Sequence, residues 1–117
     1  MMNKYMKAMF FIGILLLPLE LQAKDYAVID FTAVWCGPCR QMEPHWKNKQ
    51  IVELMEKQNI EFFKIDIDKE FRYPKMYQVG TIPTVILVEV QNGQGVEIRR
   101  RVGYQTLEQL KKFLTLP

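Results

Sequence analysis

One stretch constrains the fold more than any other. The apolar and β-branched run Tyr26 to Thr32 leads through Ala33-Val34-Trp35 into Cys36-Gly37-Pro38-Cys39, and a helix-length segment follows at once. A run of this composition favours a buried strand, and a proline two residues after Cys36 is typical of the first turn of a helix. The sequence therefore predicts two thiols between the end of a strand and the start of a helix.

Three further segments are predicted to be strands: Ile60–Asp66, Thr84–Val90 and Val96–Val102. The second of these is almost wholly apolar and is expected to be buried on both faces, whereas the last alternates apolar with charged residues and reads as an edge strand. Between these two lies Gln91 to Gly95, whose Asn-Gly pair and second glycine suit the positive-φ positions of a tight hairpin. They are therefore expected to pair antiparallel.

Helical periodicity marks the segments between and after the strands. Pro38 to Lys57 reads as one helix kinked at Pro44 or as two consecutive helices. A shorter turn is expected from Phe71 to Tyr77, and Thr106 with Gln109 fits the capping box of a terminal helix. A strand, a helix and a second strand at the start imply a parallel pair with a right-handed crossover, so the predicted fold is α/β with a mixed sheet.

The first 23 residues have the layout of a secretory leader. Lys4 and Lys7 precede the apolar run Ala8–Leu19, and Ala23 is a small residue at a suitable cleavage point. The run is short for a membrane span, which takes about 20 apolar residues, so we expect a signal peptide, with an uncleaved anchor as the alternative. Residues 24–117 then form one domain, exported to the periplasm of a bacterium, that touches a membrane only if the leader is retained.

Composition and charge exclude several classes of function. The 117 residues are 49% hydrophobic and 25% charged, as in a globular chain. The net charge is only +3, and the basic run Arg99-Arg100-Arg101 is short and lies in a predicted strand, so we expect a solvated edge and no nucleic-acid partner. Two cysteines and His45 are too few ligands for a zinc site, and Arg40 stands where haem attachment needs a histidine. No metal or cofactor is expected.

The predicted positions of the two cysteines affect their reactivity. Cys36 is expected at the N-cap of the helix, where free backbone N–H groups and the helix dipole stabilise a thiolate. Cys39 lies one turn further on, on the same side of the helix, so the two sulfurs can reach each other.

Taken together, these motifs resemble the thioredoxin family. The matching segments are Ala27–Arg40 with its Trp-Cys-Gly-Pro-Cys, Pro44, Phe63–Asp68, Val79–Thr84 and Val102-Gly103. The resemblance implies a thioredoxin-like fold with a four-stranded mixed sheet flanked by helices. The strand and helix that usually open this fold are missing, because the leader occupies their place.

The same resemblance implies roles for individual residues. Cys36 would be the attacking thiol and Cys39 the resolving one, and the two would form the redox disulfide. Pro83 would follow a cis peptide bond beside it. The surface expected to bind substrate consists of Trp35, Gly37, Pro38, Ile82, Pro83 and Gly103.

Asp30 and Lys64 match the family's buried acid and its partner behind the resolving cysteine. Each interrupts a mostly apolar strand, and burying either charge alone would be costly, so we expect the two to be buried together. The carboxylate could then accept the proton of Cys39. The alternative is that both side chains reach solvent at the strand ends.

The function expected from these observations is that of a thiol–disulfide oxidoreductase that reduces disulfides of exported proteins and is itself reduced by a membrane electron-donor protein. Gly37-Pro38 is the dipeptide of the family's reducing members. Two alternatives remain open: a disulfide-forming oxidant, which uses the same path in reverse, and a non-enzymatic binding or chaperone module on the same fold.

Overall fold

The computed structural model describes residues 25–117, and the predicted leader lies outside them. The elements follow in the order β1 (Tyr26–Thr32), α2 (Gly37–Trp46), α3 (Lys49–Lys57), β2 (Ile60–Asp66), α4 (Arg72–Met76), β3 (Thr84–Gln91), β4 (Gln94–Val102) and α5 (Leu107–Leu114). None of the helices among these residues is long and apolar enough to cross a membrane.

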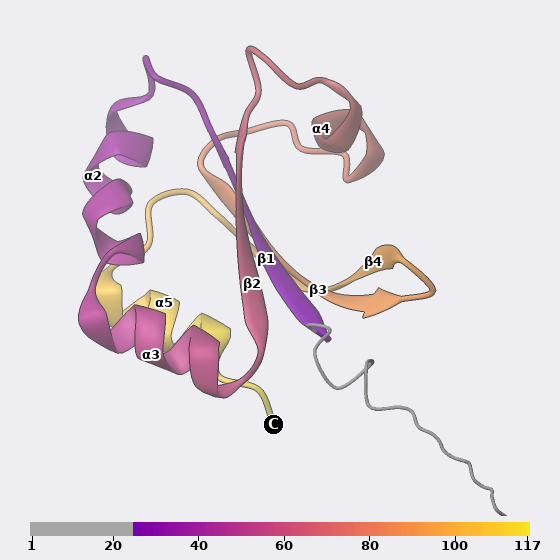
Figure 1. Cartoon of the computed structure of the whole chain (residues 1–117). Helices are drawn as coiled ribbons and strands as arrows, with labels where there is room; N and C mark the ends of the chain where they lie inside the picture. Colours follow the sequence, from indigo (N-terminus) through magenta and orange to yellow (C-terminus); the bar gives the residue numbers. More distant parts are fainter. Residues whose placement is uncertain (1–24) are drawn as a thin grey trace, which may run out of the picture.

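The four strands form one mixed sheet in the order β2-β1-β3-β4. β1 runs parallel to β2 and antiparallel to β3, and β4 pairs antiparallel with β3. The predicted α/β fold with a four-stranded mixed sheet is therefore confirmed, with β4 at one edge and β2 at the other (Figure 1). β1 lies inside the sheet with a paired strand on each side, and the cysteines follow its carboxyl end.

Of the two arrangements considered for residues 38–57, the structure has two consecutive helices. Pro44 lies inside α2, which ends at Trp46, and Asn48 caps α3 by accepting a hydrogen bond from the backbone N–H of Gln50 at 2.9 Å. The break between the two helices thus lies after Trp46 and not at Pro44. The capping box predicted at Thr106 is also present.

The larger core lies between one face of the sheet and helices α2, α3 and α5 (Figure 1). It is built from Val28, Met42, Trp46, Ile51, Met55, Ile60, Val85, Leu87, Leu110, Phe113 and Leu114. The ring of Trp46 lies 4.8 Å from that of Phe62, measured between centroids. The α2 side chains Met42 and Trp46 thus pack against the sheet, which positions the cysteines at the start of this helix.

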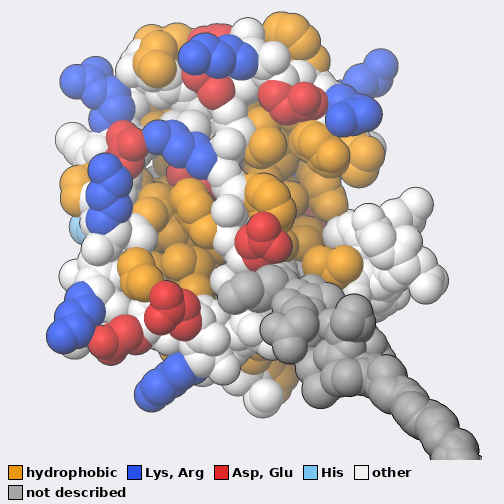
Figure 2. All heavy atoms as spheres, viewed as in Figure 1, with side chains coloured by type: hydrophobic (Ala, Val, Ile, Leu, Met, Phe, Trp, Pro, Cys, Tyr) orange, Lys and Arg blue, Asp and Glu red, His pale blue; other side chains and the backbone are white. Residues whose placement is uncertain are grey.

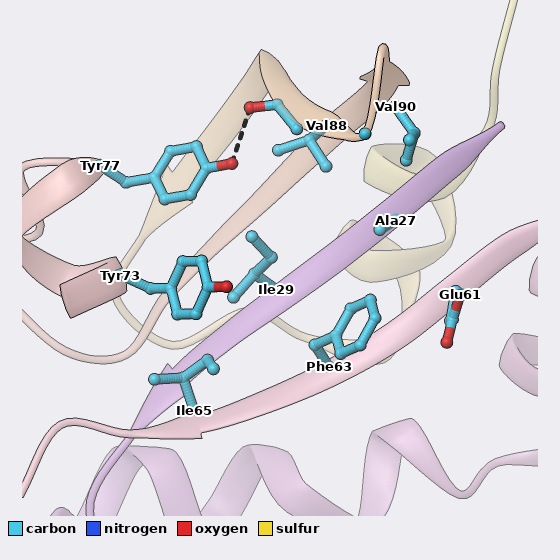
Figure 3. Close-up of a pocket in the computed structure, with 11 residues that line it drawn as sticks. Ala27, Ile29, Glu61, Phe63, Ile65, Tyr73, Tyr77, Val88 and Val90 are labelled. Atoms are coloured by element: carbon cyan, nitrogen blue, oxygen red, sulfur yellow. Dashed lines mark hydrogen bonds between the residues drawn. The ribbon is translucent and has the colours of Figure 1, made fainter. Parts of the chain in front are cut away.

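The opposite face of the sheet carries a smaller core and an open groove. Phe31, Ile86 and Val88 pack there with Tyr77, but the short helix α4 covers only part of the face. A groove of about 460 Å³ remains, lined mainly by β1, β2 and the tyrosines near α4 (Figure 3). Phe63 in this groove is 45% exposed, and Figure 2 shows apolar side chains gathered in the middle of the molecular face it draws.

The β3–β4 hairpin corrects one expectation. Asn92 and Gly93 have the positive φ values expected of the turn, but Gly95 does not and lies within β4. Its lack of a side chain matters for another reason: a Cβ there would be 2.7 Å from the hydroxyl of Tyr77, which donates a hydrogen bond to the Gly95 carbonyl (Figure 3). Gly95 therefore makes room for a tyrosine of the groove.

The basic run at 99–101 is less solvated than expected. Arg99 donates to the carbonyl of Phe113 at 2.9 Å, and Arg100 pairs with Glu97 and donates to the carbonyl of Tyr77. Two of these three guanidinium groups thus link β4 to α5 and to the end of α4, because they donate hydrogen bonds to backbone carbonyls there.

Candidate redox site

The two cysteines lie where β1 gives way to α2. Cys36 is the N-cap residue of α2, as predicted, and its Sγ accepts a hydrogen bond from the backbone N–H of Cys39 at 3.2 Å. The cysteines are joined in a disulfide, with their Cα atoms 5.2 Å apart. An N–H group that already points at the Cys36 sulfur would stabilise its thiolate once the bond is reduced.

Exposed residues surround the disulfide. Trp35 is 63% exposed, and its indole N–H donates to the Asp68 carboxylate at 2.8 Å. Gly37 and Pro38 are exposed at the start of α2. The disulfide itself is nearly buried, with Cys36 only 4% exposed, so a partner reaches the sulfur across this surface.

The segment around Pro83 completes the site. Ile82 packs against the cluster formed by Ala33 and the two cysteines, and the Ile82–Pro83 peptide bond is cis. Gly103 donates its backbone N–H to the Pro83 carbonyl at 2.7 Å. The structure thus brings Ile82 next to the disulfide and bonds Pro83 to Gly103. Pro83 itself is less than 2% exposed, and its part in binding substrate stays a prediction.

Asp30 is buried behind α2, as expected. It lies on the face of β1 that carries Val28, which packs against Met42 and Trp46 of α2. Asp30 is 5% exposed, and its Oδ1 atom has no hydrogen-bond partner among the described residues. Burial raises the pKa of Asp30 from 3.8 to about 7, against the attraction of Lys64, which lowers it.

The expectation that Lys64 is buried with Asp30 is wrong. Their Cα atoms are partners on the parallel strands, but the Lys64 ammonium turns outward to the Glu43 carboxylate, with Nζ to Oε2 at 2.6 Å. The side chain of Lys64 is 49% exposed. A flexible side chain near the sheet edge keeps its charge hydrated in this way, which costs less than burial beside an incompletely paired acid.

Sequence reasoning missed Glu43 and Asp68 as parts of the site. Glu43 follows Cys39 by four residues, a spacing that places two helical side chains on one face, and this signal could have found it. Asp68 lies just past the end of β2, where no local pattern points to Trp35. His45 lies on α2 with its Nε2 3.0 Å from the hydroxyl of Tyr104.

The site has no features of a metal centre. Within residues 25–117, no group of three or more histidine, cysteine, aspartate or glutamate side chains is placed to hold a metal ion. What the described site offers is a disulfide at a helix start, an exposed surface around it and one buried acid.

Known proteins resemble this chain in sequence and in fold. The family model described as Thioredoxin matches residues 19–116. Thioredoxin from Chlamydia trachomatis serovar D is 34% identical over 95 residues, which cover 80% of this chain and 83% of that protein. A thioredoxin H-type protein of Fagopyrum esculentum is 37% identical over 96 residues, which cover 79% of this chain and 75% of that protein. The crystal structure of the oxidised mitochondrial thioredoxin 3 of Saccharomyces cerevisiae matches with a TM-score of 0.60 and 31% identity, covering 80% of this chain and 78% of that one.

Fold and site together define an α/β redox protein with a dithiol–disulfide pair at the start of a helix. The chain belongs to the thioredoxin family. It is a thiol–disulfide oxidoreductase of the protein-disulfide reductase type, and protein disulfides are its substrates.

The raised pKa of Asp30 predicts how stability depends on pH. Between 3.8 and about 7 the folded protein holds a proton on Asp30 that the unfolded chain has released, so stability falls as pH rises through this window and then levels off. The full difference amounts to roughly 4 kcal/mol. Urea unfolding of the oxidised protein at several pH values should show this loss, and Asp30→Asn, which cannot ionise, should lack it. Equal slopes in both proteins would contradict the assignment.

Proposed function

We propose that this protein reduces disulfides of exported proteins, with Cys36 attacking and Cys39 resolving, and that a membrane electron-donor protein returns it to the dithiol form. The single observation that carries the proposal is the placement of the Cys36-Cys39 pair: Cys36 is the N-cap of α2 within an exposed surface, and Cys39 lies one turn inward beside the face that holds Asp30. The leader-like residues 1–23 support the exported setting.

The reaction proceeds in two exchanges. The Cys36 thiolate attacks one sulfur of the substrate disulfide, which forms a mixed disulfide and releases the other sulfur as a thiolate. Cys39 then gives up its proton and attacks the Cys36 sulfur, so the bond between Cys36 and the substrate breaks and the second substrate thiolate leaves. The substrate gains two electrons and the Cys36–Cys39 pair loses them. Asp30, when ionised, is the acceptor of the Cys39 proton.

The substrate surface suits an extended segment of polypeptide. Trp35 is exposed next to Cys36 in the chain and Ile82 packs against the two cysteines, so we expect an extended segment of substrate to lie across these two side chains. Ile82→Ala would remove the apolar contact beside the disulfide without adding a charge. We expect about a tenfold loss in kcat/KM for a protein disulfide, carried mainly by KM, because this contact acts in binding and not in the exchange itself. Dithiothreitol, which needs no such surface, should reduce the variant at the wild-type rate.

The exported setting is tested with the full chain carrying a carboxyl-terminal tag in a Gram-negative bacterium. We expect the mature protein to begin at Lys24, by mass spectrometry, and to fractionate with the periplasm. The matched control is Leu16→Arg, which breaks the apolar run and should leave the precursor uncleaved in the cytoplasm. A wild-type chain that stays cytoplasmic and retains Met1 would contradict the exported setting while leaving the exchange chemistry intact.

A further inference from the structure

Lys64 lies beside two carboxylates and pairs with only one of them. On the parallel ladder, the Cα atom of Lys64 is the partner of that of Asp30, and both side chains point to the α2 side of the sheet. The nearest buried carboxylate is therefore Asp30. The ammonium instead lies 2.6 Å from Oε2 of Glu43, while Oδ1 of Asp30 is left without a hydrogen-bond partner among the described residues.

Glu43 owes its position to α2. It lies one turn after Cys39 and just before Pro44, with a side chain that is 43% exposed. Together with Lys64 it lines a hollow of about 510 Å³ whose wall also includes Thr32 and Ala33, and Ala33 packs against both cysteines. The ion pair therefore stands at the solvent side of the buried acid and close to the disulfide.

We propose that Glu43 is a positioning residue for the resolving step: by binding the Lys64 ammonium, it keeps that cation from Asp30 and so keeps the buried carboxylate a strong enough base to take the proton of Cys39. This inference rests on the proposed role of Cys39 as the resolving thiol. In that step the Cys39 proton passes to Asp30, the Cys36–Cys39 bond forms, and the substrate leaves as a thiolate. A cation in direct contact with Asp30 would weaken the base by stabilising its ionised form.

The charged groups that act on Asp30 come from β2 and α2, and their effects on its pKa oppose each other. Lys64 from β2 is the cation next to Asp30, and Glu43 from α2 adds a negative charge that raises the pKa of Asp30. The same hollow is also lined by three other charged residues, Arg40, Asp66 and Lys69. The pKa of Glu43 is lowered by Lys64 and also by the charges of Lys47 and Arg40. On the other side of β1, the residue of β3 paired with Asp30 is uncharged Val85. The hydrogen bond from Lys64 lowers the pKa of Glu43, which therefore remains charged.

The direct test is the titration of the Asp30 carboxyl, followed by carbon-13 NMR in the oxidised full-length protein. In Glu43→Gln the Lys64 ammonium loses its partner and can turn to Asp30, so the Asp30 midpoint should fall by about one pH unit, a tenfold change in basicity. The matched control Glu53→Gln, an exposed glutamate of α3, should leave the midpoint unchanged. An unchanged midpoint in Glu43→Gln would overturn the proposal.

A double substitution separates positioning from the charge of Glu43 itself. In a Lys64→Gln background no ammonium is left to move, so Glu43→Gln should shift the Asp30 midpoint much less than it does with Lys64 present. An equal shift in both backgrounds would show that Glu43 acts through its own charge and would overturn the positioning role.

The pH profile of the exchange reaction tests whether the Glu43–Lys64 ion pair affects the resolving step. The rate at which a mixed disulfide resolves, followed by rapid acid quench, should respond to pH with a midpoint that moves down in Glu43→Gln together with the NMR midpoint. A wild-type protein that exchanges no disulfide would overturn the proposed function, yet the NMR titration would still test the Glu43–Lys64 arrangement. A moved NMR midpoint with an unmoved rate profile would refute the role in resolution.

Discussion

Cys36→Ser should abolish disulfide exchange, lowering kcat/KM for a protein disulfide by roughly 10³-fold or more. The reason is that a serine hydroxyl at the N-cap of α2 remains protonated at neutral pH, whereas the thiol it replaces can ionise and attack sulfur. The assay is turnover of a disulfide-bonded protein with an excess of external reductant, corrected for the reductant alone.

Cys39→Ser is the matched comparison because it removes the other sulfur of the same pair. Its Cys36 thiolate can still attack, so the variant should accumulate a mixed disulfide with its substrate that is visible as a covalent adduct by mass spectrometry. Cys36→Ser should form no such adduct. Adducts on Cys39 of the Cys36→Ser variant would reverse the roles assigned to the two cysteines.

Phe31→Ala should be among the most destabilising single substitutions in the domain. Phe31 is fully buried in β1, and its ring packs against Tyr77 with the centroids 6.4 Å apart. Replacing a buried phenylalanine by alanine costs about 3–5 kcal/mol, a large part of the ~5–15 kcal/mol that stabilises a typical domain. Urea unfolding of the oxidised proteins at constant pH measures the difference in free energy.

Val34→Ala is the control for this substitution, since Val34 is 72% exposed a few residues further along the same segment. Its effect should stay within about 0.5 kcal/mol. A loss below about 1 kcal/mol for Phe31→Ala would mean that the smaller core on the α4 side contributes little to stability, contrary to the buried position of this ring.

Much of the fold was predictable because its signals are local. β1 and β2 have the bounds that their apolar runs predict, and the capping box at Thr106 marks the start of α5. The sequence did not decide between one kinked helix and two helices over residues 38–57. Pro44 could kink a continuous helix, and Asn48 could equally cap a new one. Only the cap hydrogen bond decides between them.

The site was predictable to the extent that it depends on backbone placement. The N-cap position of Cys36 and the burial of Asp30 both follow from the strand and helix that carry them. The partner of Lys64 does not, because a long side chain on β2 can reach either of two carboxylates and the choice depends on solvation. The groove beside α4 likewise depends on how much of the sheet a five-residue helix covers.

The most direct test of the central claim is the equilibrium reduction potential of the Cys36–Cys39 pair, titrated in the purified protein against dithiothreitol or glutathione. A reversible two-electron couple near the ~ −270 mV of thioredoxin is the predicted result. A potential close to the ~ −120 mV of a strong bacterial oxidant would contradict the reducing direction. A pair that does not cycle would contradict disulfide exchange altogether.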